Sequence, residues 1–372
     1  MRIAYVTETY PPELNGVALT VERTVRWLRE RGHRVSVVRP RQGRESRVAE
    51  DTMLTPGLPI PMYPGLRFGL PIRSRLRRCW QRERPDVVHA ATEGPLGSAA
   101  IAVARKLGIP VTSDFRTNFH QYGAHYALGW AEPMIRAYLR RFHNRTDLTF
   151  APTNEVVRQL ARDGVQRVIE VGRGVDARRF SPTRRSTAMR KSWGVNDDAP
   201  AVLYVGRLAA EKNVQLLLRS FAAIKGQSAG ARLILVGDGP LRRSLQRANP
   251  DAIFTGALSG TALATAYASA DMFLFPSLTE TFGNVTLEAL ASGLIVVAYD
   301  TGAAAQHIDH EVSGFLVPVD TDSQFVVTAA VAAMRFAERG SMRRAAREAA
   351  LRAAWPAVLA RFEAHLHAVS GR

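Results

Sequence analysis

Residues 277–293 read Ser277-Leu-Thr-Glu-Thr-Phe-Gly-Asn-Val-Thr-Leu-Glu-Ala-Leu-Ala-Ser-Gly293. They follow an apolar run, Met272 to Phe275, whose length and closing Pro276 are typical of a buried strand. The good helix formers in the second half of the stretch, which ends at Gly293, predict a helix. The stretch therefore predicts a strand, a loop and a helix, with Glu280 in the loop and Glu288 about one turn into the helix.

The start of this predicted helix has the features of an anion site. Backbone N–H groups around Gly283, Asn284 and Val285 lack partners inside the helix and favour a phosphate. Gly283 has no side chain to block a close approach. Glu288 can accept both hydrogens of a ribose diol, and Glu280 would reach another part of the same ligand. Phosphate, ribose and a second polyol together describe a nucleotide sugar, while the alternative is two solvated surface carboxylates.

The stretch resembles the Glu-x7-Glu signature of retaining glycosyltransferases of the family 4 type, which have the GT-B fold. The resemblance covers nearly the whole chain, and the order and spacing of several motifs carry it. Besides the stretch itself, the motifs are Met1-Arg-Ile-Ala-Tyr-Val with Asn15-Gly16-Val17, Gly174-Val175-Asp176, Val205-Gly206-Arg207 with Glu211-Lys212-Asn213, and Gly237-Asp238-Gly239-Pro240. The chain is similar to bacterial hexosyl-, mannosyl- and sulfoquinovosyltransferases of glycolipid synthesis.

Length and alternation predict two domains of the α/β class. A chain of 372 residues with 46% apolar content can bury two cores. Strands alternating with helices predict parallel sheets, and the resemblance implies two facing Rossmann-like, doubly wound domains. We place an acceptor-binding domain at residues 1–178, with a helix at about 350–372 crossing back onto it. A donor-binding domain would then occupy residues 179–349.

One segment of the first domain departs from the family pattern. Residues 115–122 read Phe-Arg-Thr-Asn-Phe-His-Gln-Tyr, whereas similar lipid-modifying enzymes often have Tyr-His-Thr-Asn-Phe, with the histidine near the reacting sugar. Arg116 occupies the histidine slot here, and an arginine stays protonated, so it can contact a phosphate but cannot act as a general base. The resemblance implies an acceptor and sugar region that includes Asn15, Arg116, Asn118 and His120.

In the second domain, two cations flank a predicted strand-to-helix loop at the same sheet edge as Glu280. Arg207 and Lys212 would neutralise a diphosphate there, so the implied catalytic residues are Arg207, Lys212 and Glu280. The implied donor-binding residues are Gly16, Gly237, Phe282, Gly283, Asn284, Val285 and Glu288. A dinucleotide fingerprint is disfavoured, because its third glycine would fall at Arg242.

The balance of charge suggests an anionic partner. Fifty basic and 33 acidic residues give a net charge of +17. Seven arginines lie in residues 66–84, interleaved with apolar residues, and such a segment can lie on an anionic membrane surface. The alternative is a solvated helical face. Nucleic acid is not expected as a partner, because no stacking platform or known binding motif accompanies the charge.

No cofactor is expected besides the nucleotide diphosphate sugar that serves as donor substrate. Asp320-Thr-Asp322 is interpreted as a surface loop, the histidines have no convincing ligand spacing, and we predict no metal requirement. The single Cys79 permits no intrachain disulfide. Without a membrane-spanning run or a signal peptide, the chain is expected in the cytoplasm, peripheral on the inner face of the membrane.

These observations predict transfer of a hexose from a nucleotide diphosphate sugar to an acceptor hydroxyl, which the basic segment suggests belongs to a membrane lipid. Retention at the anomeric carbon is implied by the resemblance, and the departing phosphate would take the acceptor proton. The alternatives are a nucleotide-sugar epimerase or a sugar phosphorylase on the same fold. A non-catalytic protein that binds a nucleotide sugar or an anionic surface is a further alternative.

Overall fold

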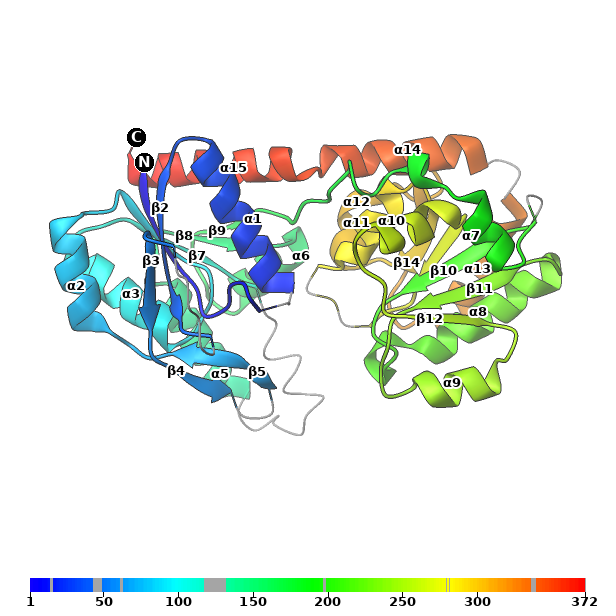
Figure 1. Cartoon of the computed structure of the whole chain (residues 1–372), viewed down its shortest axis with the longest axis horizontal. Helices are drawn as coiled ribbons and strands as arrows, with labels where there is room; N and C mark the ends of the chain where they lie inside the picture. The colour runs from blue at the N-terminus through cyan, green and yellow to red at the C-terminus, as the bar shows by residue number, and fades with distance from the viewer. Residues whose placement is uncertain are drawn as a thin grey trace. The chain divides into compact units, whose positions relative to one another are not determined.

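The computed structural model describes residues 1–13, 16–42, 49–60, 63–116, 132–196, 199–278, 280, 282–335 and 339–371. The chain divides into two compact units (Figure 1). Unit 1 comprises Met1–Gly172 and Leu359–Arg372, and unit 2 comprises Arg173–Val358. The sequence-based division placed the boundary at 178/179 and the start of the returning helix at about residue 350.

Within the described residues, unit 1 contains a seven-stranded parallel sheet in the order β3-β2-β1-β6-β7-β8-β9. Its strands are β1 (Arg2–Val6), β2 (Arg34–Pro40), β3 (Thr52–Thr55), β6 (Val87–Ala90), β7 (Val111–Asp114), β8 (Leu148–Ala151) and β9 (Val168–Glu170). The chain winds outward in opposite directions from the adjacent strands β1 and β6. Such a switch point is where open α/β sheets bind ligands, beyond the carboxyl ends of the strands.

Helices cover both faces of this sheet, as the sequence predicted. They are α1 (Gly16–Glu30), α2 (Arg73–Arg82), α3 (Pro95–Lys106), α5 (Glu132–His143), α6 (Asn154–Arg162) and α15 (Trp355–Ser370). Alternate residues of β1 point to opposite faces, so Ala4 and Val6 pack in one core and Ile3 and Tyr5 in the other. The second core is filled by α1 together with Phe362 and Leu366 of α15.

An antiparallel hairpin that the sequence analysis did not predict joins the sheet to α2. It consists of β4 (Gly57–Ile60) and β5 (Tyr63–Gly69). A buried carboxylate, Glu8, follows β1 and accepts hydrogen bonds from the backbone N–H of Gly69, at the end of the hairpin, and of Leu96, in the first turn of α3. Glu8 therefore ties three segments together at the carboxyl edge of the sheet.

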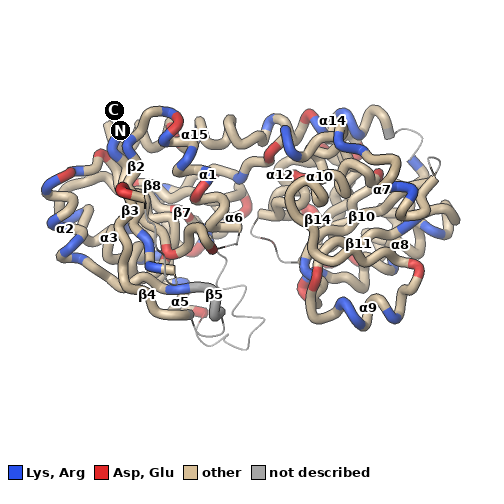
Figure 2. Tube along the Cα trace, viewed as in Figure 1, with Lys and Arg blue, Asp and Glu red and all other residues tan. Residues whose placement is uncertain are grey.

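The basic segment contains part of this hairpin and α2. Leu76 and Trp80 of α2 are buried in the core, whereas the arginines of the helix are exposed. Figure 2 shows several basic positions along α2. The apolar side of the helix is thus occupied by the protein, so insertion of that side into a bilayer is excluded and a basic outer face remains. No helix of the described part of the chain is both long and apolar enough to cross a membrane.

Unit 2 contains, in the residues described, a six-stranded parallel sheet in the order β12-β11-β10-β13-β14-β15. Its strands are β10 (Ala201–Val205), β11 (Arg232–Val236), β12 (Ile253–Gly256), β13 (Met272–Phe275), β14 (Ile295–Tyr299) and β15 (Gly314–Val317). This is the strand order of a Rossmann-like sheet, with its switch point between β10 and β13.

Helices of unit 2 pack on this sheet around one large core, in which every residue of β10, β13 and β14 is buried. They are η2 (Pro182–Arg184), α7 (Thr187–Ser192), η3 (Ala210–Lys212), α8 (Val214–Gln227), α9 (Arg242–Ala248), α10 (Gly260–Ser269), α11 (Asn284–Ala291), α12 (Gly302–His307), α13 (Asp322–Met334) and α14 (Arg339–Arg352). Strands buried on both faces read as continuous apolar runs, which is why the sequence identified them.

The predicted strand, loop and helix of residues 272–293 are confirmed. β13 ends at Phe275, and α11 begins at Asn284 after Gly283, whose φ of 89° is in the left-handed region. The helix stops before Gly293, whose φ is 71°. Glycine adopts such conformations at little cost, and it therefore sets both limits of α11.

A buried ionic network fixes the amino end of β13. The Asp271 carboxylate accepts hydrogen bonds from Arg190 and Arg185 at 2.8 Å each, from Arg343 at 3.3 Å, and from the backbone N–H of Ala201 at 3.0 Å. These partners come from α7, the turn before it, α14 and β10. Asp271 thus links segments far apart in the sequence beneath the sheet of unit 2.

Candidate donor site and buried carboxylates of unit 1

Two of the predicted catalytic residues meet at the switch point of unit 2. Lys212 ends η3, in the loop after β10, and Glu280 lies in the loop after the neighbouring strand β13. Lys212 Nζ forms an ion pair with Glu280 Oε1, and both side chains are about four-fifths buried. Ser277 Oγ donates to the same Glu280 oxygen at 2.9 Å and lies 3.3 Å from Lys212 Nζ. The parallel pairing of β10 with β13 brings these side chains together.

Arg207 does not join this pair. Its side chain is 61% exposed and lies 3.8 Å from Glu211, four residues along the same loop. Its carbonyl oxygen accepts a hydrogen bond of 3.0 Å from the Tyr204 hydroxyl, which fixes the backbone but leaves the guanidinium at the surface. The prediction that Arg207 and Lys212 belong to one loop is confirmed, but they make no common contact among the described residues.

Gly237 has a steric reason to be glycine. Its φ is 140°, and a Cβ atom there would lie 1.9 Å from the Gly206 carbonyl oxygen. A Cβ on Gly239 would lie 2.4 Å from the carbonyl oxygen of Leu208. The loops after β10 and β11 therefore approach each other so closely that no side chain fits between them. This packing holds the loop that carries Lys212.

Around the start of α11, Glu280 approaches the backbone at Gly283. A Cβ on Gly283 would lie 3.7 Å from Glu280 Cγ. Asn284 Oδ1 is buried and has no hydrogen-bond partner among the described residues, while Val285 packs against the core. Glu280 and Phe282 line a small recess here, together with Phe275, Ser277, Thr286, Ala298, Tyr299, Thr301 and Ala304.

Phe282 contributes its backbone as well as its ring. The ring is buried, and the carbonyl oxygen accepts a hydrogen bond of 2.6 Å from the N–H of Ala303, at the start of α12. A Cβ on Gly302 would lie 2.6 Å from that oxygen. Gly302 is therefore required by the packing of α12 against this loop.

Glu288 lies in α11 in a poorly solvated environment. Burial raises the pKa of its carboxyl to about 7, against the opposing effects of the Tyr267 hydroxyl and Arg179. Tyr267 is itself fully buried, and its hydroxyl has no hydrogen bond of standard geometry in the described part of the chain. A carboxyl with this pKa changes charge near neutral pH when no ligand is bound.

Two buried carboxylates flank the switch point of unit 1, and the sequence analysis missed both. Glu8 follows β1 and Glu93 follows the neighbouring β6. Burial raises the pKa of Glu8 to about 7 and that of Glu93 to about 8. The Arg116 backbone N–H donates to Glu93 Oε1 at 3.3 Å. Glu8 and Glu93 each lie within three residues of the end of a predicted buried strand, and this position is the signal by which the sequence could have identified them.

Arg116 points into unit 1. Its Nε donates to Asp114 Oδ2 at 2.6 Å, its Nη2 lies 3.3 Å from the Tyr5 hydroxyl, and its side chain is only 10% exposed. Burial of Asp114 would raise its pKa, but Arg116 and His89 together lower it to about 2. Arg116 is thus an internal counter-ion for a buried carboxylate.

Four predicted site residues remain, three of the acceptor region and Gly16 of the donor site. Asn15, Asn118 and His120 lie outside the described residues. Gly16 is the first residue of α1, and a Cβ there would have no described atom within 4 Å. The described neighbours therefore do not explain a glycine at position 16.

The second half of the chain thus forms a Rossmann-like unit whose switch point holds a lysine, two acids and the start of a helix, as a protein that binds a nucleotide diphosphate sugar requires. Comparison with known proteins identifies the class. Residues 14–179 match the model of Glycosyltransferase Family 4, and residues 199–334 match that of Glycosyl transferases group 1.

Full-length relatives and solved structures agree with these matches. The chain is 37% identical to a GDP-mannose-dependent alpha-mannosyltransferase of Mycolicibacterium smegmatis, covering 100% of this chain and 98% of the relative. It is 28% identical to an alpha-monoglucosyldiacylglycerol synthase of Streptococcus pneumoniae, covering 80% and 71%. The structure of Anabaena Alr3699/HepE in complex with UDP matches with a TM-score of 0.78 at 17% identity, covering 99% and 100%, and shows the same fold.

The protein is a retaining hexosyltransferase with the GT-B fold that uses a nucleotide diphosphate sugar. It belongs to glycosyltransferase family 4. The sequence left an epimerase, a phosphorylase and a non-catalytic binding protein open as alternatives. Membership in this family favours glycosyl transfer over all three.

Proposed function

We propose that the protein transfers mannose from GDP-mannose to a hydroxyl of a membrane lipid. The choice of GDP-mannose as donor rests on the full-length similarity to a GDP-mannose-dependent alpha-mannosyltransferase. The lipid acceptor is supported by the diacylglycerol named for a more distant relative and by the basic outer face of α2. Turnover of GDP-mannose, compared with UDP-glucose and GDP-glucose at equal concentration, tests the donor.

In this proposal, Lys212 and the N–H groups at the start of α11 stabilise the departing diphosphate. A lysine and a helix start both favour negative charge, and stabilisation of charge that develops in the transition state speeds the reaction. The Lys212 ammonium forms an ion pair with Glu280. A diphosphate would compete for Lys212 and release Glu280 to accept hydrogen bonds from hydroxyls of the donor sugar.

The Glu288 carboxylate is proposed to accept hydrogen bonds from both ribose hydroxyls of the nucleotide. The departing phosphate is proposed to take the proton of the acceptor hydroxyl. The acceptor is then activated at the moment at which the bond to the diphosphate breaks, and the step requires no separate protein base. Arg207 is proposed to contact the diphosphate from the loop surface, which requires its exposed side chain to turn toward the ligand.

A substitution pair tests the proposed role of Lys212. Lys212→Ala is expected to lower kcat about 10²–10³-fold, the loss typical of removing one group that stabilises an oxyanion. Lys225→Ala is the matched control, because Lys225 is a partly exposed lysine of the same unit that forms an ion pair with Asp251 at 3.0 Å. Equal kcat values for the two variants would refute the role of Lys212.

Glu280→Ala separates transfer from nucleotide binding. We expect kcat to fall strongly, while GDP, which lacks the sugar, still binds within a few-fold of the wild-type affinity. Loss of GDP binding to the same extent as transfer would mean that Glu280 organises the loop and does not bind the sugar.

Transfer itself is proposed to need no metal ion, because Lys212 and the helix start supply the positive charge that a metal would provide. Turnover measured after EDTA treatment, with and without added Mg²⁺ or Mn²⁺, tests this. A requirement for either ion would refute it.

Association with the membrane is proposed to be electrostatic. Six arginines at the outer side of α2 and its end are exposed, at positions 73, 75, 77, 78, 82 and 84. Each basic residue near an anionic surface contributes about 1 kcal/mol, and salt screens the effect. Binding should therefore be lost as ionic strength rises.

Co-sedimentation with vesicles tests this surface. The protein is expected to bind phosphatidylglycerol vesicles but not phosphatidylcholine vesicles. Arg77→Gln with Arg78→Gln should weaken binding, whereas Arg243→Gln with Arg247→Gln on the exposed side of α9 should not. If both pairs weaken binding equally, total charge and not α2 determines the association.

A further inference from the structure

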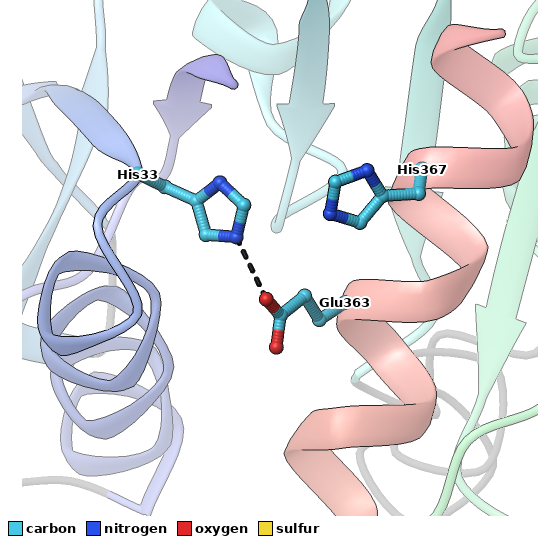
Figure 3. Close-up of side chains that lie close together, drawn as sticks. All are labelled: His33, Glu363 and His367. Atoms are coloured by element: carbon cyan, nitrogen blue, oxygen red, sulfur yellow. Dashed lines mark hydrogen bonds and ion pairs between the residues drawn. The ribbon is translucent and has the colours of Figure 1, made fainter. Parts of the chain in front are cut away.

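His33, Glu363 and His367 form a compact cluster of metal-ligating side chains in unit 1 (Figure 3). One ligand atom of each lies within 4.8 Å of the ligand atoms of the other two. Glu363 and His367 are four residues apart on α15 and therefore share a face of the helix. His33 lies in the turn between α1 and β2. The fold alone brings position 33 to positions 363 and 367, so spacing in the sequence gave no sign of the set.

The donor atoms suit a borderline transition-metal ion. Two imidazole nitrogens and one carboxylate oxygen bind Zn²⁺ at about 2.0–2.2 Å, with a fourth position for water. A tetrahedral site places its ligand atoms about 3.3 Å apart. His33 Nε2 and Glu363 Oε1, at 2.8 Å, are already closer than this. Other separations in the cluster, which reach up to 4.8 Å, would have to close by as much as about 1.5 Å. Rotation of the His367 side chain can provide this, because its ring already lies beside that of His33, with centroids 5.5 Å apart.

The surroundings hold two of the ligands in place. His33 Nδ1 lies 3.0 Å from the Met1 nitrogen, and His33 Nε2 lies 2.8 Å from Glu363 Oε1. The Met1 ammonium can only donate, so His33 Nδ1 accepts and the proton of the imidazole lies on Nε2, toward Glu363. Binding of a metal ion at Nε2 would therefore release one proton from the His33–Met1 pair, and Nδ1–H would then donate to the neutral Met1 amine. The His33 and Glu363 side chains are 7% and 9% exposed, so water competes little for the space between them.

The Met1 ammonium and the Arg31 guanidinium both face the cluster. Arg31 Nε lies 3.3 Å from Glu363 Oε2 and 3.4 Å from Oε1, and its side chain is 59% exposed. Its charge opposes a metal ion, but the exposed side chain can turn outward and leave Oε1 to the ion. Removal of this charge should therefore strengthen metal binding, which a purely structural ion pair would not predict.

We propose that His33, Glu363 and His367 bind a divalent transition-metal ion of the Zn²⁺ type, which fastens α15 to unit 1. His33 precedes β2 and so lies at the amino edge of the sheet, whereas Glu8 and Glu93 follow their strands at the carboxyl edge, where α/β sheets bind substrates. The ion would stabilise the native state and take no part in transfer. This inference does not rest on the proposed donor or acceptor.

Metal binding is tested on the whole protein after removal of metal with EDTA. Titration with ZnCl₂ by calorimetry should reveal one saturable site, and Zn²⁺ should raise the thermal midpoint. His367→Gln should weaken Zn²⁺ binding at least about tenfold, and it leaves the His33–Glu363 contact intact. His365→Gln, on the same helix but beside Phe150, is the matched control and should bind as the wild type does. Arg31→Gln should bind more tightly.

Co²⁺ adds a geometric readout, because tetrahedral coordination gives it strong visible absorption. We expect these bands in the wild type and in His365→Gln, and their loss in His367→Gln. Equal Zn²⁺ affinities for His367→Gln and the wild type, or no saturable binding by the wild type, would overturn the proposal. Retained transfer by His367→Gln is expected, and a large loss of kcat would contradict a role confined to stability.

Discussion

Replacement of Glu288 by glutamine is expected to change stability in a way that depends on pH. Burial raises the pKa of this carboxyl from 4.5 to about 7. The native protein therefore binds the proton more tightly than the unfolded chain does. The stabilisation that results is complete below pH 4.5, falls as pH rises toward 7, and is absent above. Glutamine keeps the size of the side chain and does not ionise.

The magnitude follows from the two pKa values. A difference between 4.5 and about 7 corresponds to about 3 kcal/mol, since one pH unit is about 1.4 kcal/mol. Relative to the wild type, Glu288→Gln should therefore gain up to about 3 kcal/mol of unfolding free energy between pH 4.5 and pH 8. Urea denaturation at several pH values measures this gain. Glu348→Gln, at an exposed position of α14, is the control.

Nucleotide binding should change in the opposite sense. The proposed bond to the ribose diol needs the ionised carboxylate, so binding of GDP to the wild type should release a proton near pH 6.5 and tighten as pH rises to 8. Glu288→Gln should bind GDP more weakly at pH 8 and show little pH dependence. A stability difference between the variant and the wild type that is constant from pH 5 to pH 8 would refute the reasoning, because Glu288 would then be ionised throughout.

Three further substitutions, together with one control, test the packing that holds the sites. Gly237→Ala should cost about 3 kcal/mol or more, because its Cβ would lie 1.9 Å from a carbonyl oxygen; Gly226→Ala in α8, where the space is open, should instead stabilise by about 0.5–1 kcal/mol. Asp271→Ala should cost about 3–5 kcal/mol in urea denaturation, because three arginines lose a common buried partner. Arg116→Ala leaves the buried Asp114 without its main counter-ion. Because the pKa of Asp114 is lowered to about 2 in the native state, the wild type has this stabilisation above about pH 4 and loses it as pH falls through 2. The loss caused by Arg116→Ala should therefore be large at pH 7 and small near pH 2, and a loss independent of pH would show that Asp114 is not the group affected.

Most of the fold follows from patterns that are local in the sequence. Parallel strands such as β13 and β14 are buried on both faces and are continuous apolar runs, so their positions along the chain could be predicted. The glycines that limit α11 were equally visible, because left-handed backbone favours this residue. The meeting of Lys212 with Glu280 followed from the position of each after its strand.

What the sequence did not reveal depends on contacts between distant segments. The β4–β5 hairpin ends at Gly69, whose backbone N–H donates a hydrogen bond to Glu8. The hydrophobic periodicity of the sequence does not predict such a contact. Leu76 and Trp80 are among the apolar residues of the basic segment that the sequence suggests could face a membrane, but they are buried in the core of unit 1. The Arg207 side chain is exposed, and its carbonyl oxygen accepts a hydrogen bond from the Tyr204 hydroxyl, neither of which composition can predict.

Phe362 and Leu366 complete a core whose other members lie mainly in the first 150 residues. On the ribosome, the first unit therefore remains unfinished while the whole of the second is being made. At about 5–20 residues per second this delay is on the order of ten seconds or more. During that time one apolar face of the first sheet is covered only in part, by α1, so a nascent chain stalled before residue 359 should recruit chaperones through its earliest-made half.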